Sequence, residues 1–327
     1  MITRYHKFAV AASFVLAMAF TFSCSSNDDN DNPPPQAAAV ISSSDGSSSS
    51  GGSSSGGSSS SVAPKCGGVE YNPATEGCCK NKKYTLKRSH YGKDKEQFCD
   101  ERDGKTYVYV AIPENGTGQK WMAQNLNYEV EGGKCYGEDS EVIVGWEDVW
   151  TPITNILSNA EIQANCDNYG RFYNYITAMD IGSEYATIEF NAPEKHKGIC
   201  PDGWHIPSNA DWNTLMRAIN PSCSDENDAC DEVGLKLKAW SILWKSNGRG
   251  VDDYGFSALP GGYGISGGLY FRQVGELGMW LSSSEYSDGL NPYYYWYIGF
   301  GFNGDGAHKY HNAPKDNTMF NVRCVQD

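Results

Sequence analysis

The chain has 327 residues, of which 26 are basic and 40 acidic, so its formal net charge at pH 7 is −14. This charge argues against nucleic acid and against anionic membrane surfaces as partners. The composition is also rich in glycine and in aromatic residues, with 21 tyrosines and 9 tryptophans. Many turns and many aromatic rings suit a loop-rich domain that contains β-structure, and they also suit contact with carbohydrate.

The first segment has the features of an export signal. Arg4 and Lys7 precede an uninterrupted apolar run, Phe8 to Phe22. This run is short for a bilayer span, which needs ~20 residues, but it suits the hydrophobic region of a signal peptide. Ser23-Cys24 resembles a lipobox, in which the cysteine is acylated, although a phenylalanine at position 22 departs from it. We expect a signal peptide over 1–23 and lipidation at Cys24; an ordinary cleaved signal with an incidental Cys24 is the alternative.

Residues 24–65 predict a disordered tether. An acidic cluster at 28–31 resembles the surface-export signal of Bacteroidetes-type lipoproteins, and a solvated start to the linker explains it equally well. From Ile41 to Ser61, fourteen of 21 residues are serine, and such a tract buries too little apolar surface to become ordered. The ~40 residues between Cys24 and the first cysteine of the folded part have an average reach of roughly 35 Å. The predicted location is the outer membrane, at the cell surface, with the lipid anchor as the membrane contact.

The cysteines fit an exported protein. Ten remain after Cys24, and an even number in an exported chain predicts a disulfide framework. Zinc would require Cys-x-x-Cys pairs with histidine partners, which the sequence lacks, so we expect neither a metal site nor a cofactor. Four of the ten lie in residues 66–99, a small module with too little chain for a core of its own. Their three possible pairings stay open. The four are Cys66, Cys78, Cys79 and Cys99.

The main domain is expected over residues 100–327, and its first elements are strands. A turn at 103–105 leads into a β-branched and aromatic strand at 106–112, and a second strand at 120–126 follows a turn at 115–118. One helix is predicted around 170–179. Another is predicted over 209–219, capped by Ser208, with Trp212, Leu215, Met216 and Ile219 on one apolar stripe.

From Gly250 onward the pattern predicts turns and short strands. The expected strands lie at 256–259, 269–274, 278–282, 293–300 and 319–325. In the run from Tyr293 to Ile298, alternation predicts that Tyr294, Trp296 and Ile298 face the core and that Tyr293, Tyr295 and Tyr297 face outward. The predicted fold class is therefore α+β, with two helices early and an antiparallel sheet late.

Ordered segments of this domain resemble the Fibrobacter succinogenes major paralogous domain, which occurs in many exported lipoproteins. The matching segments are 102–107 (RDGKTY), 121–128 (WMAQNLNY), 170–173 (GRFY), 200–208 (CPDGWHIPS) with Trp212, 256–263 (FSALPGGY), 280–285 (WLSSSE) and 322–325 (VRCV). The resemblance implies a fold similar to the C-type lectin-like and formylglycine-generating-enzyme superfamily, in which a disulfide joins the segment before a helix to the last strand. Cys200 and Cys324 take those positions.

The resemblance does not assign an activity to any residue. The sugar-binding tripeptide of calcium-dependent lectins is absent, and so is the copper-binding cysteine pair of the formylglycine-generating enzymes. We also expect local disulfides between Cys135 and Cys166 and between Cys223 and Cys230. The acidic residues of the 223–230 loop could hold calcium, but they lack the spacing of a calcium loop, so a solvated loop is favoured.

No catalytic residue is predicted. His205 lacks a nucleophile at a recognisable spacing and is interpreted as a buried structural histidine. The serines at 282–284 lack the Gly-x-Ser-x-Gly pattern. Glu285, Glu276 and the aspartates at 252–253 could serve a glycosidase, but the sequence does not place any two of them together.

The ligand surface is predicted on the loops between Gly250 and Asp305. Tyr263, Tyr270 and Tyr286 are the expected binding residues, because glycine-rich turns allow close approach and tyrosine rings offer flat apolar faces with a polar tip. The predicted function is a surface binding or adhesion module for polysaccharide or another surface protein. The alternative is a divergent enzyme of the formylglycine-generating-enzyme-like fold.

Overall fold

The computed structural model describes residues 64–73, 75–85, 96–113, 118–139, 141–143 (backbone), 157–246, 248–287, 289 and 293–327. All of them belong to one compact unit, Ser60–Asp327. The predicted signal peptide, the lipidation site at Cys24, most of the tether and most of the 115–118 turn lie outside the described residues. Within the described ranges, no helix is both long enough and apolar enough to span a bilayer.

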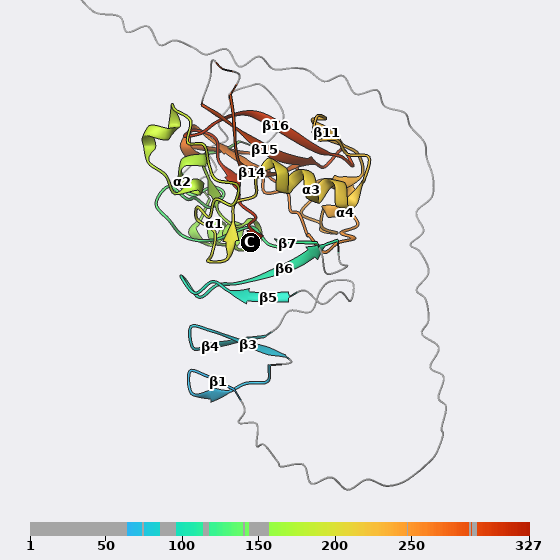
Figure 1. The fold of residues 1–327 in the computed structure, drawn as a ribbon. Coiled ribbons are helices and arrows are strands. Elements are labelled where there is room, and N and C mark those ends of the chain that lie inside the picture. Colours follow the sequence, from blue (N-terminus) through green and yellow to red (C-terminus); the bar gives the residue numbers. More distant parts are fainter. Residues whose placement is uncertain are drawn as a thin grey trace, which may run out of the picture. The chain divides into compact units, whose positions relative to one another are not determined.

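The cysteine-rich module begins with two small antiparallel pairs (Figure 1). Strand β1 (Lys65–Cys66) pairs with β2 (Val69–Glu70), and β3 (Glu76–Cys79) pairs with β4 (Lys82–Thr85). The four cysteines whose pairing was open form Cys66–Cys78 and Cys79–Cys99. The module is therefore held by covalent links between its short strands, as expected for a segment with few buried side chains.

A five-stranded sheet crosses the predicted boundary at residue 100. Its order is β10-β18-β7-β6-β5. The strands are β5 (Glu96–Cys99), β6 (Thr106–Ile112), β7 (Gln119–Met122), β10 (Trp204–His205) and β18 (Val325–Gln326). Because β5 pairs with β6 in antiparallel register, the last cysteine of the module lies in a sheet of the main domain.

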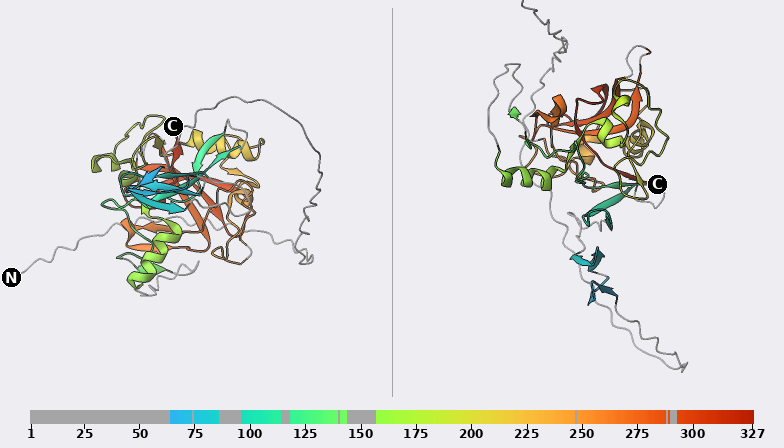
Figure 2. Two further views of the ribbon diagram at one scale, coloured as in Figure 1. Left: turned by 90° about the horizontal axis from the view of Figure 1, so that it is seen from below. Right: turned by 90° about the vertical axis from the view of Figure 1, so that its left-hand side faces the viewer.

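The largest sheet has six strands in the order β11-β16-β15-β14-β17-β9 (Figures 1 and 2). They are β9 (Phe172–Tyr173), β11 (Ala229–Cys230), β14 (Leu277–Tyr286), β15 (Tyr294–Gly301), β16 (Ala307–Pro314) and β17 (Phe320–Asn321). A third sheet contains β8 (Glu141–Ile143), β12 (Tyr263–Ile265) and β13 (Tyr270–Arg272). The described residues thus form an α+β structure in which antiparallel strands dominate.

Four α-helices occur in the described residues. They are α1 (Asn159–Tyr169), α2 (Tyr175–Met179), α3 (Asn209–Ile219) and α4 (Val233–Leu237), with 3-10 turns at Ser183–Ala186 and Ser266–Gly268. Helix α3 confirms the prediction residue by residue. Ser208 and Asp211 form a capping box at its start, and the predicted apolar stripe is buried.

Both faces of the six-stranded sheet are covered. On one face, Tyr295 packs with Tyr175 and Met179 of α2 in the first core cluster. On the other, Ile298 and Phe300 pack with α3 and α4 in the second cluster. The prediction that Tyr295 and Tyr297 face outward is therefore wrong. Side chains do alternate between the two faces of β15, but the face expected to be exposed to solvent packs against the first core cluster.

Three other expectations about elements also fail. The described residues contain four helices where two were predicted. Helix α1 buries only Cys166 and Tyr169, and α4 has only five residues, so neither gives a clear periodic signal. Residues 256–259 form a single isolated bridge rather than a strand. Strand β16 was missed because its inward positions include Ala307 and Lys309, which are not large apolar residues.

Candidate functional site

The predicted tyrosines do not form one cluster. Tyr263 is partly buried, and its ring lies 6.3 Å from that of Phe320, which stacks on Tyr297 at 4.4 Å. The ring of Tyr286 stacks on His311 at 3.9 Å and meets Trp296 edge-on at 5.7 Å. Trp296 and Tyr297 are neighbours on β15 and so point to opposite faces of that strand. Tyr286, which contacts Trp296, and Tyr263, which packs on the Phe320 ring beside Tyr297, therefore lie on opposite sides of β15.

Tyr270 lies on β13, which is hydrogen-bonded to the strand that carries Tyr263. Its side chain is partly exposed. The glycine-rich turns predicted for this region are present, and Gly262, Gly267 and Gly268 all have positive φ. The loops thus have the expected backbone, but they do not bring the three tyrosine rings together.

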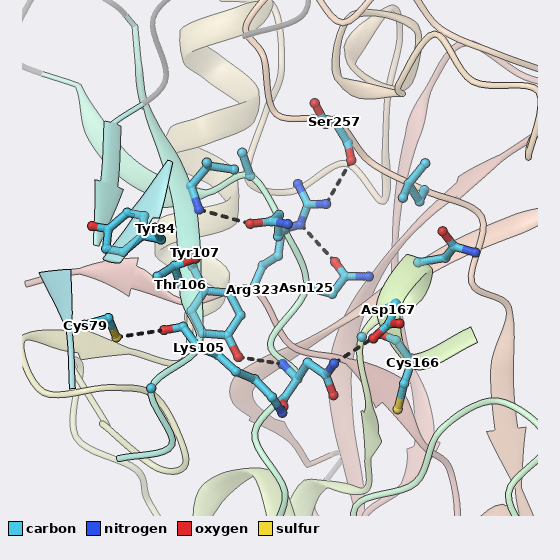
Figure 3. Close-up of a pocket in the computed structure, with 18 of the residues that line it drawn as sticks. Cys79, Tyr84, Lys105, Thr106, Tyr107, Asn125, Cys166, Asp167, Ser257 and Arg323 are labelled. Carbon is cyan, nitrogen blue, oxygen red and sulfur yellow. Dashed lines mark hydrogen bonds between the residues drawn. The ribbon is translucent and has the colours of Figure 1, made fainter. Parts of the chain in front are cut away.

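A cavity of about 830 Å³ lies elsewhere, beside the β3–β4 hairpin (Figure 3). We call it the hairpin cavity. It is lined by Cys79 and residues 82–84 of the hairpin, by residues 104–108, 123–125 and 127, by residues 166–168 and 170 at the end of α1, and by Ser257, Leu259 and Arg323. In Figure 3, Tyr84 and Tyr107 lie on one side and Asp167 on the other.

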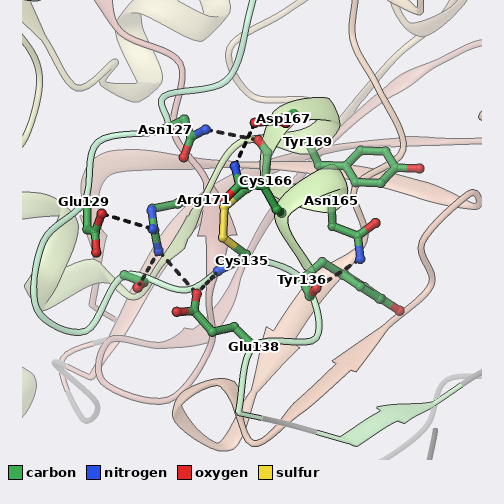
Figure 4. The surroundings of a disulfide bond; sticks show 12 residues. Asn127, Glu129, Cys135, Tyr136, Glu138, Asn165, Cys166, Asp167, Tyr169 and Arg171 are labelled. Carbon is green, nitrogen blue, oxygen red and sulfur yellow. Dashed lines mark hydrogen bonds and ion pairs between the residues drawn. A yellow bond between two sulfur atoms is a disulfide. The ribbon is translucent and has the colours of Figure 1, made fainter. Parts of the chain in front are cut away.

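The wall formed by α1 is fixed by a disulfide (Figure 4). Cys135–Cys166 ties the last turn of α1 to the loop after β7. Arg171 donates to Glu138 Oε2 at 3.2 Å and lies 3.5 Å from Glu129 Oε2, and Glu138 accepts from the Cys135 backbone N–H at 2.7 Å. These contacts hold Asp167 and Asn168 at the cavity.

The floor of the hairpin cavity contains a buried polar network around Arg323. Its Nε donates to Asn125 Oδ1 at 3.0 Å, and its terminal nitrogens donate to the carbonyl oxygens of Phe256 and of Ser257, the latter at 3.0 Å. The same Asn125 oxygen accepts from Trp280 Nε1 at 2.8 Å. Four of the sequence segments that suggested the family thus meet in one network.

Three amide side chains of the hairpin cavity retain hydrogen-bonding capacity. Gln124 uses Oε1 to accept from the Val108 N–H at 3.1 Å, and Asn127 uses Nδ2 to donate to the Cys166 carbonyl at 3.2 Å. Within the described residues, the Gln124 amide nitrogen, Asn127 Oδ1 and the whole Asn168 amide have no other partner. Burial raises the pKa of the Tyr84 hydroxyl, so this phenol stays neutral.

Sequence reasoning did not find this cavity. Gln124 belongs to the segment 120–126 that was interpreted as a strand, Asn127 follows it directly, and Asn168 belongs to the helix that was not predicted. One signal was present: residues 124–127 contain three amides in four positions, an unusual density next to the apolar Trp121-Met122-Ala123. Such a run is more typical of a polar site than of a sheet interior.

The predicted disulfides are all present. Cys200–Cys324, Cys223–Cys230 and Cys135–Cys166 occur together with the two bridges of the small module. The acidic loop closed by Cys223–Cys230 is held by basic side chains: Asp225 pairs with Arg217, and its carbonyl accepts from Lys309 Nζ at 2.7 Å.

His205 is a buried structural residue, as expected. Its Nδ1 bonds to Asp327 Oδ1 at 2.8 Å, and its Nε2 lies 3.5 Å from Asp211 Oδ2. The candidate carboxylates lie in separate contacts. Glu285 pairs with Lys315 and Glu276 with Lys245, while Asp252 bonds to Ser257.

Comparison with known families and proteins gives one match. The model of the Fibrobacter succinogenes major domain matches residues 116–326. The first segment of the resemblance, 102–107, lies before this range. Neither the search of curated proteins nor the search of solved structures found a match. Since the family model covers well over half of the 327 residues, the chain belongs to the Fibrobacter succinogenes major domain family.

Proposed function

We propose that this protein is a lipoprotein, anchored through Cys24 at the outer cell surface, that binds polysaccharide in the hairpin cavity. The observation that carries the proposal is the set of amides with unused donors and acceptors, Gln124, Asn127 and Asn168. A sugar hydroxyl both donates and accepts, and a side-chain amide offers both functions. The volume of about 830 Å³ lies in the range of small-molecule pockets.

The fold we propose is C-type lectin-like. Two contacts support it: the Cys200–Cys324 disulfide, which joins the segment before α3 to the end of the domain, and the antiparallel pairing of β10 with β18. Together they bring the region before a helix against the last strand, which is the arrangement that the family resemblance implies.

Binding is favoured over the divergent-enzyme alternative. The carboxylates Glu285, Glu276 and Asp252 are each engaged by a different partner, and a glycosidase needs two that flank one bond. Tyr286 is kept as a second contact for longer chains, because its ring belongs to a partly exposed group with Trp296 and His311.

The test uses full-length protein in detergent on an array of soluble and insoluble glycans. Wild-type protein should be retained and should leave the glycan unchanged, whereas an enzyme would alter it. Gln124→Ala combined with Asn168→Ala should reduce retention, and Asn303→Ala, which removes an exposed amide outside the cavity lining, serves as the control. Equal retention of all three proteins would place the ligand elsewhere. If none of the three proteins is retained on glycans and the wild type binds a surface protein instead, a protein ligand is favoured over polysaccharide.

A further inference from the structure

The hairpin cavity has a charge opposite to that of the protein. Its charged lining side chains are Lys82, Lys83, Lys105 and Arg323, against the single carboxylate Asp167. The chain as a whole carries −14. A concave site in which cations outnumber anions concentrates field lines that attract negative ligands. Only a cation that is not already paired with a carboxylate of the protein can pair with a ligand.

Two of the lysines are already neutralised. Lys83 Nζ lies 3.2 Å from Glu76 Oε1, and Lys105 Nζ lies 3.5 Å from Asp103 Oδ2. Lys82 differs from them. It is exposed on β4, and within the described residues its ammonium has no hydrogen-bond or ion-pair partner. Lys82 is therefore the available cation at the rim of the hairpin cavity.

Arg323 supplies a partly compensated positive charge at the floor. Its side chain is 1% exposed, and the three groups that accept its hydrogen bonds are neutral: one amide and two backbone carbonyls. Within the described residues, no carboxylate lies within 4 Å of the guanidinium. Burial lowers its pKa to about 9, so it remains protonated at neutral pH. The charge of Asp252 partly offsets the effect of burial on this pKa, and the guanidinium carbon lies 4.2 Å from the ring centroid of Phe256 and 5.5 Å from that of Trp280. The buried charge is therefore stabilised in part by these groups, and part of its positive field remains for a ligand.

We propose, building on the polysaccharide-binding function, that the hairpin cavity binds an acidic oligosaccharide. A sugar carboxylate pairs with the Lys82 ammonium, and the partly compensated charge of Arg323 adds a favourable field from the floor. The hydroxyls of the same sugars bond to the amides of Gln124, Asn127 and Asn168. Asp167 opposes the carboxylate, so its charge limits the affinity. Uronic acid chains combine the carboxylate and the hydroxyls that this lining requires.

The experiment compares trigalacturonate with its fully methyl-esterified form, by calorimetric titration of the full-length protein in calcium-free buffer. The esters remove the charge and keep the sugar rings and free hydroxyls. The acid form should bind at least about tenfold more tightly at low salt, and the difference should shrink as salt screens the charges. Equal affinity for the acid and the ester would overturn the proposal.

Two charge variants and one control locate the effect. Lys82→Glu should weaken trigalacturonate binding about three- to tenfold, and Asp167→Asn should strengthen it by a similar factor. Lys195→Glu makes the same charge change at an exposed lysine away from the cavity and should have little effect. If Lys82→Glu and Lys195→Glu weaken binding equally, the attraction is non-specific and the site is rejected.

The outcomes also separate this inference from the function on which it rests. If the ester and neutral glycans bind as well as the acid, the polysaccharide-binding proposal stands and the proposal of an acidic ligand is rejected. If neither form binds and no glycan on the array binds, both proposals are rejected. Circular dichroism of each variant checks that it is folded.

Discussion

Arg323 Nε donates a hydrogen bond to Oδ1 of Asn125, 3.0 Å away and 198 residues apart in the sequence. The same oxygen accepts from Trp280 Nε1, and Asn125 Nδ2 donates to the Tyr169 carbonyl at 2.8 Å. A single amide therefore connects four segments of the domain. The sequence blocks that identify the family are in this respect structural, because they build the network that closes the fold.

Asn125→Ala should strongly destabilise the protein. The substitution leaves the buried donors of Arg323 and Trp280 without their acceptor, and each buried unsatisfied group costs about 1–3 kcal/mol. We expect the free energy of unfolding in urea to fall by about 2–5 kcal/mol. Asn168→Ala, at an exposed position, should change it by less than about 0.5 kcal/mol. Similar values for the two variants would contradict the structural role of the network.

His205 should make stability depend on pH near neutrality. Burial by itself lowers its pKa, but the carboxylates of Asp211 and Asp327 outweigh burial and raise the pKa above the ordinary value of 6.5. A raised pKa means that the folded state binds the proton more tightly than the unfolded state does. The contribution of His205 to the free energy of unfolding is thus complete below about pH 6.5 and is lost as the pH rises through the folded-state pKa. Urea unfolding should show this loss in the wild type and not in His205→Gln; equal slopes would refute it.

Asp211 should make the stability of the protein depend on pH in the acidic range. Burial raises its pKa, but His205 and Ser208 outweigh this effect, and the pKa is below the ordinary value of 3.8. Its contribution is present above about pH 3.8 and is lost as pH falls through the folded pKa. Asp211→Asn should reduce this acid sensitivity, measured as the pH midpoint of acid unfolding. An unchanged midpoint would show that other carboxylates dominate.

The Cys200–Cys324 disulfide should contribute more stability than the short bridges. It joins residues 124 apart, against 12 for Cys66–Cys78. In the chain-entropy model these loops correspond to about 5 and about 3 kcal/mol. Replacing each pair by serines and measuring unfolding in urea should therefore give the larger loss for the long loop. A larger loss for Cys66–Cys78 would show that loop length does not govern these bridges.

Cys24→Ala should release the protein from the membrane fraction while leaving its domain folded. The reason is the apolar run that ends at Ser23-Cys24, followed by a serine-rich tract. Fractionation of expressing cells measures the release, and circular dichroism of the released protein checks the fold. Membrane retention of the variant at the wild-type level would remove the lipid-anchor proposal.

Tyr286→Ala tests the second contact. If long polysaccharide chains extend to the group formed by Tyr286, Trp296 and His311, the variant should lose retention on insoluble polysaccharide and keep its affinity for a trisaccharide. The Tyr263→Ala variant provides a comparison, because that ring packs on Phe320 and its loss should act through stability. If Tyr286→Ala is retained as well as the parent, this group does not contact the ligand.

The parts of the fold that could be predicted are those governed by local rules. Helix α3 followed from its cap and stripe, and strand 106–112 from its β-branched and aromatic residues. Helix α1 and strand β16 gave weaker signals. Helix α1 has a local capping box of Ser158 and Glu161 but buries only Cys166 and Tyr169, so it has no apolar stripe. Strand β16 forms a hairpin with β15, but its inward positions include Ala307 and Lys309. The burial of Tyr295 does not follow from local rules: alternation gives two faces, but only the tertiary structure shows that both are covered.

The site was harder to predict than the fold. Residues that line the hairpin cavity come from segments between Cys79 and Arg323, and no periodic pattern links them. The tyrosines were chosen because aromatic residues near glycine turns are a common feature of binding loops. In the structure, Tyr263 packs against other side chains. The polar groups that keep hydrogen-bonding capacity at the cavity are amides, and two of them lie next to apolar residues in the sequence.

The two disulfides of the small module also determine how the chain transmits force. Cys66 is bonded to Cys78, and the next residue, Cys79, is bonded to Cys99. A pull on residue 65 therefore reaches β5 by a covalent route that bypasses residues 67–77 and 80–98. Tension cannot extend either hairpin, and the load enters directly at the hydrogen-bonded pair β5–β6. Reduction of these bonds would add about thirty residues of extensible chain.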